Sequence, residues 1–252
     1  MHLELGFDPS GTVVTAGSDG EQQARSRSVS DSNGQLQTTV YRGMPIARFI
    51  ARQLGNPSGA FGKHLMSRFL NRGNDELVSS ALAFLELRSH DRFLDIGFGG
   101  GESLYKASRV ITGGHLYGLD RSPDMVALAE RRFAEAVHQG QLELTVGDVT
   151  ALPYPDASVD KLLTANTVYF WPDLAAGLRE CIRVLAPGGR IAIAISGARK
   201  MQTYGPITSH GFTFFEGPEL AERLAKLGLE NTRAVALHGR RSYGDLVILG
   251  DK

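Results

Sequence analysis

Short apolar segments alternate with amphipathic helical ones from Asp91 to the end of the chain, and this alternation constrains the fold more than any other feature. Five segments have the length and apolar composition of buried strands: RFLDI, HLYGLD, QLELTV, VDKLLTA and RIAIAIS. Apolar residues between them recur at helical spacing, as in DLAAGLRECIRVL, where one face carries Leu174, Leu178, Ile182 and Leu185. Such alternation predicts a mostly parallel sheet with helices on both faces.

The C-terminal segments TRAVALH and YGDLVILG flank a short polar turn and predict an antiparallel hairpin. Added to the five earlier strands, the hairpin completes an α/β fold with a Rossmann-like, doubly wound, seven-stranded and mostly parallel sheet. We expect Ser122 to cap a helix that starts at Pro123, Gly228 to end the last helix, and residues 187–189 (Pro-Gly-Gly) to form a turn before RIAIAIS. Ligands bind such sheets at the carboxyl ends of the strands, where the strand order reverses.

Two regions of different composition precede this sheet. Residues 1–40 are mostly Ser, Thr, Gly, Gln and Asp with few large apolar side chains, so we predict a disordered tail. Residues 41–90 contain three segments with apolar residues at helical spacing: MPIARFIARQL, AFGKHLMSRFL and DELVSSALAFLEL. We therefore divide the chain into a tail, a helical region and a ligand-binding domain at residues 91–252.

Charge and cysteine content exclude several classes of function. Lys and Arg total 27, as do Asp and Glu, so the net charge of zero gives no electrostatic case for binding nucleic acid or an anionic membrane. The single cysteine, Cys181, rules out an intramolecular disulfide framework and a multi-thiolate metal site. No apolar run approaches the roughly 18 residues of a membrane-spanning helix, and the N-terminus shows no secretory signal. We therefore expect a cytoplasmic protein.

A glycine-rich turn follows the first strand of the sheet, in the segment FLDIGFGGGES. Asp95 ends the strand, and the glycines that follow, Gly97, Gly99 and Gly101, permit positive φ and close approach of a ligand. The dinucleotide fingerprint G-x-G-x-x-G fails because its sixth position is Glu102, and no Gly-Lys-Ser/Thr completes a P-loop. The remaining pattern, D-x-G-x-G-x-G, places an acid where a pyrophosphate would be repelled. It resembles motif I of the class I S-adenosylmethionine-dependent methyltransferases.

Two further acids follow the next two strands. Asp120 ends HLYGLD about twenty residues beyond the glycine turn, where adenosine-binding α/β folds use an acid to accept hydrogen bonds from the ribose hydroxyls. Asp148 and Val149 follow QLELTV. The resemblance implies that Asp148 binds the adenine amino group and that the backbone of Val149 lies near the ring.

The resemblance covers residues 91–252, including LPYPDASVD and RVLAPGGRIAIAIS, and is nearest to small-molecule methyltransferases that include quinone C-methylating enzymes. It implies S-adenosyl-L-methionine as the cofactor, a small-molecule methyl acceptor, and a helical cover formed by residues 41–90. The cofactor-binding residues that it implies are Asp95, Gly97, Phe98, Gly99, Gly101, Asp120, Arg121, Met125, Gly147, Asp148, Val149 and Asn166.

The residues after VDKLLTA would face the crevice and form a wall for the acceptor: Asn166, Tyr169, Phe170 and Trp171. We expect three catalytic residues. The Tyr169 hydroxyl would orient the acceptor, and His210 or His64 would accept its proton, because an unperturbed imidazole has a pKa near 6.5. The seven histidines are scattered without a His-x-x-x-His pair, so we expect no metal.

Other functions stay open at this point. A nicotinamide-dependent oxidoreductase has a similar sheet, although the third fingerprint glycine and a Tyr-x-x-x-Lys pair are missing. An aminopropyltransferase would need an acidic polyamine pocket where this chain has aromatic residues, whereas a non-catalytic nucleoside-binding subunit would keep the same cofactor residues. The neutral charge disfavours a nucleic-acid methyltransferase, as does the lack of Asn-Pro-Pro-Tyr or Pro-Cys after VDKLLTA. The acceptor, the methylated atom and the oligomeric state stay open, and a homodimer is compatible with the sequence.

Overall fold

The structure is a computed structural model of the 252-residue chain. It describes residues 75–197, 215–239 and 242–252 in full, and the backbone of four short strands nearer the N-terminus. The chain divides into two compact units, residues 1–50 and 51–252, which are described separately.

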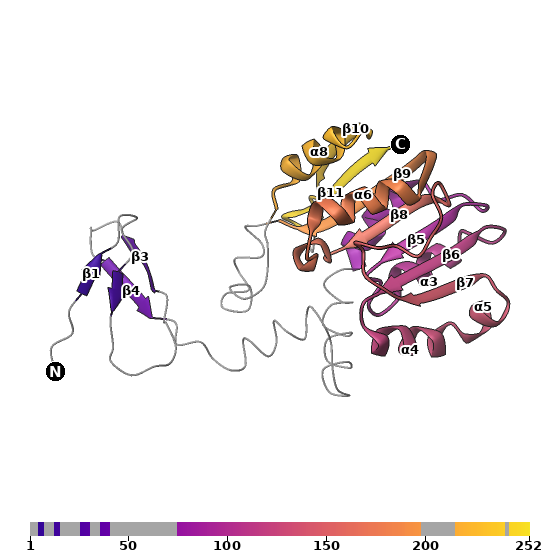
Figure 1. Ribbon diagram of the computed structural model, residues 1–252, viewed down its shortest axis with the longest axis horizontal. Helices are drawn as coiled ribbons and strands as arrows, with labels where there is room; N and C mark the ends of the chain where they lie inside the picture. Colours follow the sequence, from indigo (N-terminus) through magenta and orange to yellow (C-terminus); the bar gives the residue numbers. More distant parts are fainter. Residues whose placement is uncertain are drawn as a thin grey trace. The chain divides into compact units, whose positions relative to one another are not determined.

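The N-terminal unit contains two antiparallel strand pairs among its described residues. β1 (Leu5–Phe7) pairs with β2 (Val13–Thr15), and β3 (Ser26–Ser30) pairs with β4 (Leu36–Val40) (Figure 1). These strands fall within the segment for which the sequence predicts a disordered tail. Their Val and Thr residues are β-branched and favour extended backbone. The prediction of a tail gave more weight to the polar composition of the segment than to these residues. The division at residues 40 and 90 stays a prediction.

The second unit is built on a seven-stranded sheet in the order β10-β11-β9-β8-β5-β6-β7 (Figure 1). Neighbours among β5 to β9 are parallel, and β11 is antiparallel to both β9 and β10. The predicted doubly wound α/β fold with a C-terminal hairpin is therefore confirmed. The strands are β5 (Arg92–Ile96), β6 (His115–Asp120), β7 (Leu142–Val146), β8 (Val159–Ala165), β9 (Leu185–Ser196), β10 (Glu230–Ala236) and β11 (Asp245–Asp251).

The strand order reverses at β5. The chain runs from β5 to β6 and β7 on one side, then returns to the other side of β5 as β8. The carboxyl ends of β5, β6 and β8 therefore lie together at one edge of the sheet. The glycine turn at residues 97–101, Asp120 and Asn166 all stand at or directly after these ends, so the topology gathers the predicted site there.

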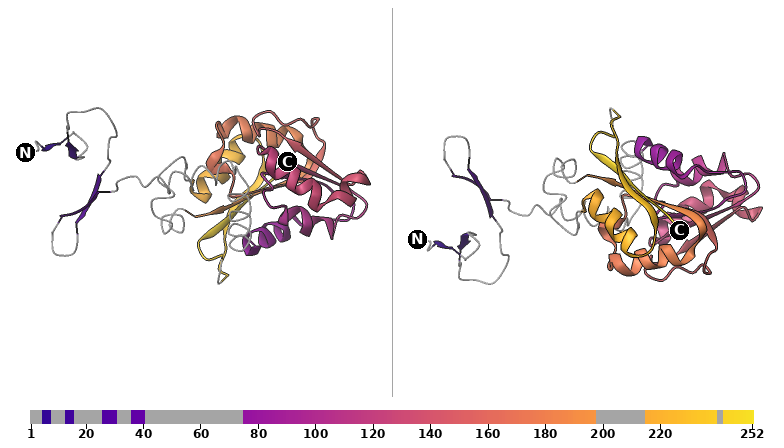
Figure 2. Two further views of the ribbon diagram at one scale, coloured as in Figure 1. Left: turned by 90° about the horizontal axis from the view of Figure 1, so that it is seen from below. Right: turned by 90° about the horizontal axis from the view of Figure 1, so that it is seen from above.

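Helices cover both faces of the sheet (Figure 2). Residues 75–85 form a helix that packs on one face together with α3 and α4, while α6 and α8 pack on the other. The other described helices are α3 (Glu102–Ser108), α4 (Pro123–Arg132), α5 (Ala134–His138), the 3-10 turn η1 (Val168–Phe170), α6 (Leu174–Val184) and α8 (Gly217–Lys226).

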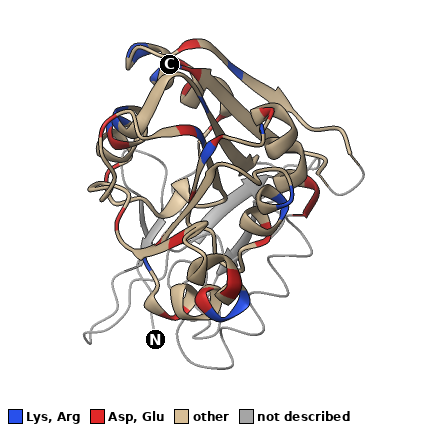
Figure 3. Cartoon of the chain, turned by 90° about the vertical axis from the view of Figure 1, so that its right-hand side faces the viewer, with Lys and Arg blue, Asp and Glu red and all other residues tan. Residues whose placement is uncertain are grey.

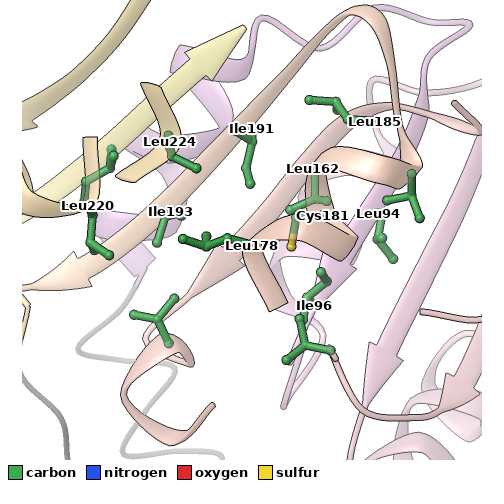
Figure 4. Packing of buried hydrophobic residues seen from close by; sticks show 14 of the residues in the cluster. Leu94, Ile96, Leu162, Leu178, Cys181, Leu185, Ile191, Ile193, Leu220 and Leu224 are labelled. Carbon is green, nitrogen blue, oxygen red and sulfur yellow. The ribbon is translucent and has the colours of Figure 1, made fainter. Parts of the chain in front are cut away.

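Strand β9 shows why both faces are buried. Ile191 and Ile193 point toward α6 and α8, where they join a core that includes Leu178 and Cys181 (Figure 4). The intervening Ala192 belongs to the core on the other face, under the helix of residues 75–85. Because side chains alternate along a strand, a continuous apolar run is what a strand covered on both faces requires.

Some predicted boundaries were wrong in detail. The segment at residues 187–189 lies inside β9, where the pairing register with β8 shifts: Val159 pairs with Leu185, and Lys161 pairs with Arg190. Ser122 occupies the cap position of α4, but its side chain makes no capping hydrogen bond. Its backbone N–H instead donates to the carboxylate that ends β6.

Candidate functional site

The glycine turn between β5 and α3 has three residues in the left-handed region, Gly97, Gly99 and Gly101, with φ of +71°, +52° and +74°. A Cβ at Gly97 would collide with the methyl group of Thr167, and one at Gly101 would lie 2.7 Å from the Phe133 ring. At Gly99 a Cβ would meet no described heavy atom within 4 Å. The first and third glycines are thus required by packing, while the second leaves space on the open side of the loop.

Asp120 ends β6 directly beside this loop and is 7% exposed. Its Oδ2 accepts a hydrogen bond from the Gly99 N–H at 3.0 Å, and its Oδ1 accepts one from the Ser122 N–H at 2.9 Å. Burial raises the pKa of Asp120, although both N–H donors and the charge of Arg121 oppose this shift. The two donors fix the carboxylate in one orientation at the carboxyl edge of the sheet.

Asp95 lies beneath the loop and is 1% exposed. Its Oδ2 accepts a hydrogen bond from the Ser103 hydroxyl in the first turn of α3. Burial raises the pKa of Asp95 to about 7, the Ser103 hydrogen bond opposes the shift, and the negative charge of Asp120 adds to it. The sequence analysis did not predict Ser103 as a site residue. A serine in the first helical turn after the glycines could have indicated this contact.

Asp148 follows β7 and is exposed. Its Oδ1 accepts hydrogen bonds from the Thr150 N–H at 2.9 Å and from the Thr150 hydroxyl at 2.7 Å, and these bonds lower its pKa. Arg121 also lowers the pKa of both Asp120 and Asp148, so its positive charge acts on both carboxylates. The Gly147 N–H donates to the Asp120 carbonyl at 3.1 Å and thereby links this segment to β6.

A second residue that the sequence reasoning missed holds the glycine loop from the other side. Arg132, at the end of α4, donates to the Gly100 carbonyl and forms an ion pair with Glu102 at 3.2 Å. Its guanidinium carbon also lies 5.1 Å from the centre of the Phe133 ring, which itself packs against Gly101. The loop is therefore held between Asp120 and the end of α4.

Comparison with known families identifies this arrangement. Residues 94–193 match the family model described as "Methyltransferase domain". The chain is therefore similar to the methyltransferase domain family over this segment, which is less than half of its length. The matched segment runs from β5 into β9 and so contains the glycine loop, Asp120 and Asp148.

Curated relatives of the methyltransferase domain include two enzymes with named substrates. The 27-O-demethylrifamycin SV methyltransferase of Amycolatopsis mediterranei is 34% identical over 50% of this chain and 46% of its own length. The demethylmenaquinone methyltransferase of Thermus thermophilus is 33% identical over 51% of this chain and 58% of its own length. The chain thus spans about half the length of these relatives.

Solved structures show the same fold. The crystal structure of a SAM-dependent methyltransferase from Aquifex aeolicus superimposes with a TM-score of 0.63 at 20% identity. The match covers 75% of this chain and 97% of that chain.

The remaining residues predicted to bind the cofactor of the methyltransferase domain lie in different settings. Phe98 and Met125 are buried in the core on the face of α3 and α4, so a cofactor contact by Phe98 would use its backbone. Val149 is also buried, and a Cβ at Gly177 of α6 would lie 3.3 Å from its side chain. The structure thus brings the loop, Asp120 and Asp148 to one edge, with apolar residues behind them.

On the acceptor side, Tyr169 is placed differently from the prediction. It is 3% exposed, and its hydroxyl oxygen lies 2.9 Å from the Ser196 carbonyl and 3.1 Å from Asn166 Oδ1. Asn166 Oδ1 also accepts a hydrogen bond from the Ser196 N–H at 3.0 Å, and burial raises the pKa of Tyr169. Both side chains therefore join the ends of β8 and β9, and an acceptor-orienting role for Tyr169 stays a prediction.

The two candidate proton acceptors, His210 and His64, lie outside the described residues. Among the residues that the structure describes, no group of three or more His, Cys, Asp or Glu side chains is arranged to hold a metal ion. Within the same residues, no helix combines the length and the apolar character needed to cross a membrane. Cys181 is fully buried in the core, and burial raises the pKa of its thiol.

Proposed function

We propose that this chain transfers a methyl group from S-adenosyl-L-methionine to a small-molecule acceptor by direct in-line displacement, giving S-adenosylhomocysteine. The observation that carries the proposal is the Asp120 carboxylate, fixed by the Gly99 and Ser122 N–H groups beside a loop whose middle glycine faces open space. A buried acid oriented by backbone donors suits the two hydroxyls of a ribose, because each oxygen keeps a second lone pair to accept with.

The donor set fits the cofactor. Gly99 leaves room for close approach to the backbone, and Asp148, exposed and ionised, can accept from an adenine amino group. When bound, S-adenosylmethionine supplies a methyl group already activated by a positive sulfonium. The protein's task is then to align the acceptor and exclude water, which requires a rigid loop and a defined wall opposite it.

For the acceptor we propose a small organic molecule. The net charge is zero, and Figure 3 shows basic and acidic positions interspersed along the described ribbon, which suits neither a nucleic acid nor an anionic membrane. The named substrates of the two relatives are likewise small molecules. His210 or His64 would accept a proton where the methyl acceptor carries one. The single cysteine favours a cytoplasmic location.

Calorimetric titration with S-adenosylhomocysteine tests the proposal. Asp120→Ala removes a charged hydrogen-bond partner and should weaken binding at least about tenfold while the fold survives. Asp156→Ala is the matched control, since Asp156 is an exposed aspartate that forms an ion pair with Arg183. Equal affinity of the Asp120→Ala and unmodified chains would contradict the assignment.

Turnover with labelled S-adenosylmethionine and a panel of phenols, amines, thiols and hydroxy acids then tests transfer itself. Methylation of any compound in the panel would support the proposed methyltransferase activity. Cofactor binding without transfer to any acceptor would favour a nucleoside-binding subunit, and binding of a nicotinamide cofactor in place of S-adenosylhomocysteine would favour an oxidoreductase.

A further inference from the structure

Four residues form a continuous row of hydrogen bonds from the end of β5 to the turn after β8; we call it the threonine chain. The Thr164 hydroxyl donates to the Ile96 carbonyl at 3.1 Å. The Thr167 hydroxyl contacts the Thr164 hydroxyl, and the Trp171 Nε1–H donates to Thr167 Oγ1 at 3.2 Å. The threonine chain thus joins Ile96, the residue before the glycine loop, to Trp171. Trp171 ends the turn at residues 166–171, which we call the acceptor-side turn.

The chemistry at the two ends fixes the direction of every bond in the threonine chain. A carbonyl can only accept and an indole N–H can only donate, whereas each hydroxyl has one hydrogen. The Thr164 hydroxyl donates its one hydrogen to the Ile96 carbonyl. The Thr167 hydroxyl must therefore donate to Thr164 and accept from Trp171. Loss of the Thr167 hydroxyl would take away the donor to the fully buried Thr164 oxygen and the acceptor of the Trp171 Nε1–H.

Thr167 stands between the two halves of the site. Its methyl group packs where a Cβ at Gly97 would sit, so it touches the first residue of the glycine loop. It is also the residue from which η1 (Val168–Phe170) begins. One side chain therefore contacts the loop through carbon and holds the turn through oxygen.

Trp171 is fixed from its other side by α6. A Cβ at Gly177 would lie 2.6 Å from Cε3 of the indole, so glycine at this helix position permits close contact. The indole is therefore clamped between a helix backbone and the Thr167 hydroxyl. Trp171 is the single tryptophan of the sequence, so tryptophan emission, excited selectively over the seven tyrosines, reports on this residue alone.

We propose that Thr167 is a positioning residue, whose hydroxyl holds the acceptor-side turn and Trp171 in register with the cofactor loop. This inference rests on the proposed function. It separates two roles within one side chain: the methyl group fills space against Gly97, and the hydroxyl sets the position of the turn. Binding at the loop should therefore be sensed at Trp171 through the threonine chain.

Two substitutions divide these roles. Thr167→Val keeps a methyl group against Gly97 and removes the hydroxyl, whereas Thr167→Ser keeps the hydroxyl and removes the methyl. The full chain is titrated with S-adenosylhomocysteine by calorimetry and by Trp171 emission. Thr167→Val should bind roughly 3- to 10-fold more weakly, with an altered emission maximum and a diminished response to the ligand. Thr167→Ser should bind and respond like the unmodified chain, as should the control Thr232→Val at the far edge of the sheet.

The reverse order, with Thr167→Ser impaired and Thr167→Val normal, would overturn the inference and leave a packing role. Should Thr167→Val not fold, Trp171→Phe breaks the same chain at its other end and should weaken binding to a similar degree, measured by calorimetry. Unchanged binding by Trp171→Phe would then overturn the inference. Failure of the unmodified chain to bind the ligand would overturn the proposed function and this inference together, whereas normal binding by both the unmodified and Thr167→Val chains would overturn this inference alone.

Discussion

Two segments leave the carboxyl edge of the sheet close together, and they are built in different ways. The glycine loop at residues 97–101 takes its shape from backbone conformation, with left-handed glycines and N–H groups that donate to Asp120 and to neighbouring carbonyls. The turn at residues 166–171 takes its shape from side chains, through the threonine chain and the contact of Asn166 and Tyr169 with Ser196.

The difference separates what each segment can do. A backbone-built loop leaves open space for a ligand beside Gly99, and its own N–H groups hold its shape. A side-chain-built turn can be altered by single substitutions, which suits the part of a site that adapts to one acceptor rather than another.

Gly99 offers the largest effect and tests the backbone side of this comparison. Gly99→Val should abolish binding of S-adenosylhomocysteine, because a branched side chain would occupy the open space beside the loop. Gly140→Val is the matched control: Gly140 has φ of +67° and no described atom within 4 Å of a Cβ, and it lies after α5, outside the candidate site. Both variants carry similar backbone strain, so binding measured by calorimetry isolates the steric block. Normal binding by a folded Gly99→Val chain would mean that the ligand does not approach this glycine.

Asp95 tests how far a buried acid behind the glycine loop lowers the free energy of unfolding at neutral pH. Its pKa of about 7 in the folded chain, against 3.8 as the ordinary value, means that the native state binds the proton more tightly. Stability should therefore fall as pH rises from about 4 to above 7. Asp95→Asn lacks this titration, so its stability relative to the unmodified chain should rise on the order of 4 kcal/mol across that window.

Urea unfolding of both chains between pH 4 and pH 8 measures this difference, with Asp160→Asn as a control whose stability should differ from the unmodified chain by a constant amount in this window. Hydrogen bonds and charge from Arg92 lower the pKa of Asp160, so its contribution is present above its unfolded pKa and is lost on acidification. A pH-independent gap between Asp95→Asn and the unmodified chain would show that Asp95 titrates normally.

The same contrast explains what the sequence could predict. The order of strands and helices, the glycine loop and Asp120 were accessible because apolar periodicity, glycine and a strand-terminal acid are local signals. Arg132 was not, because its contact with Gly100 joins residues that are 32 positions apart and depends on where α4 ends. Tyr169 was predicted to face the crevice because it follows a strand. The buried position of its hydroxyl depends on the turn at Asn166, which has φ of +55°. No glycine at that position indicated such a turn in the sequence.

Substitution of Arg132 tests whether the glycine loop needs side-chain contacts to keep its conformation. Arg132→Gln removes the ion pair with Glu102 and weakens the bond to the Gly100 carbonyl, so S-adenosylhomocysteine should bind roughly 3- to 10-fold more weakly. Arg131→Gln, a change of the exposed neighbour on α4, is the matched control. Equal affinities for the two variants would sharpen the comparison, since the loop would then depend on its backbone alone.

Removal of the N-terminal residues should have the smallest effect. Both segments of the site and the cores on either face of the sheet lie within the second compact unit, and residues 1–40 belong to the first. A chain that starts at Tyr41 should therefore melt within about 2 °C of the full chain and bind S-adenosylhomocysteine with the same affinity. Differential scanning calorimetry with and without the ligand separates two ways of failing. A lower melting temperature with normal binding would show that the strands β1 to β4 stabilise the second unit. A normal melting temperature with weaker binding would show that residues 1–40 contribute to the site, and the comparison of two segments would then have to include a third.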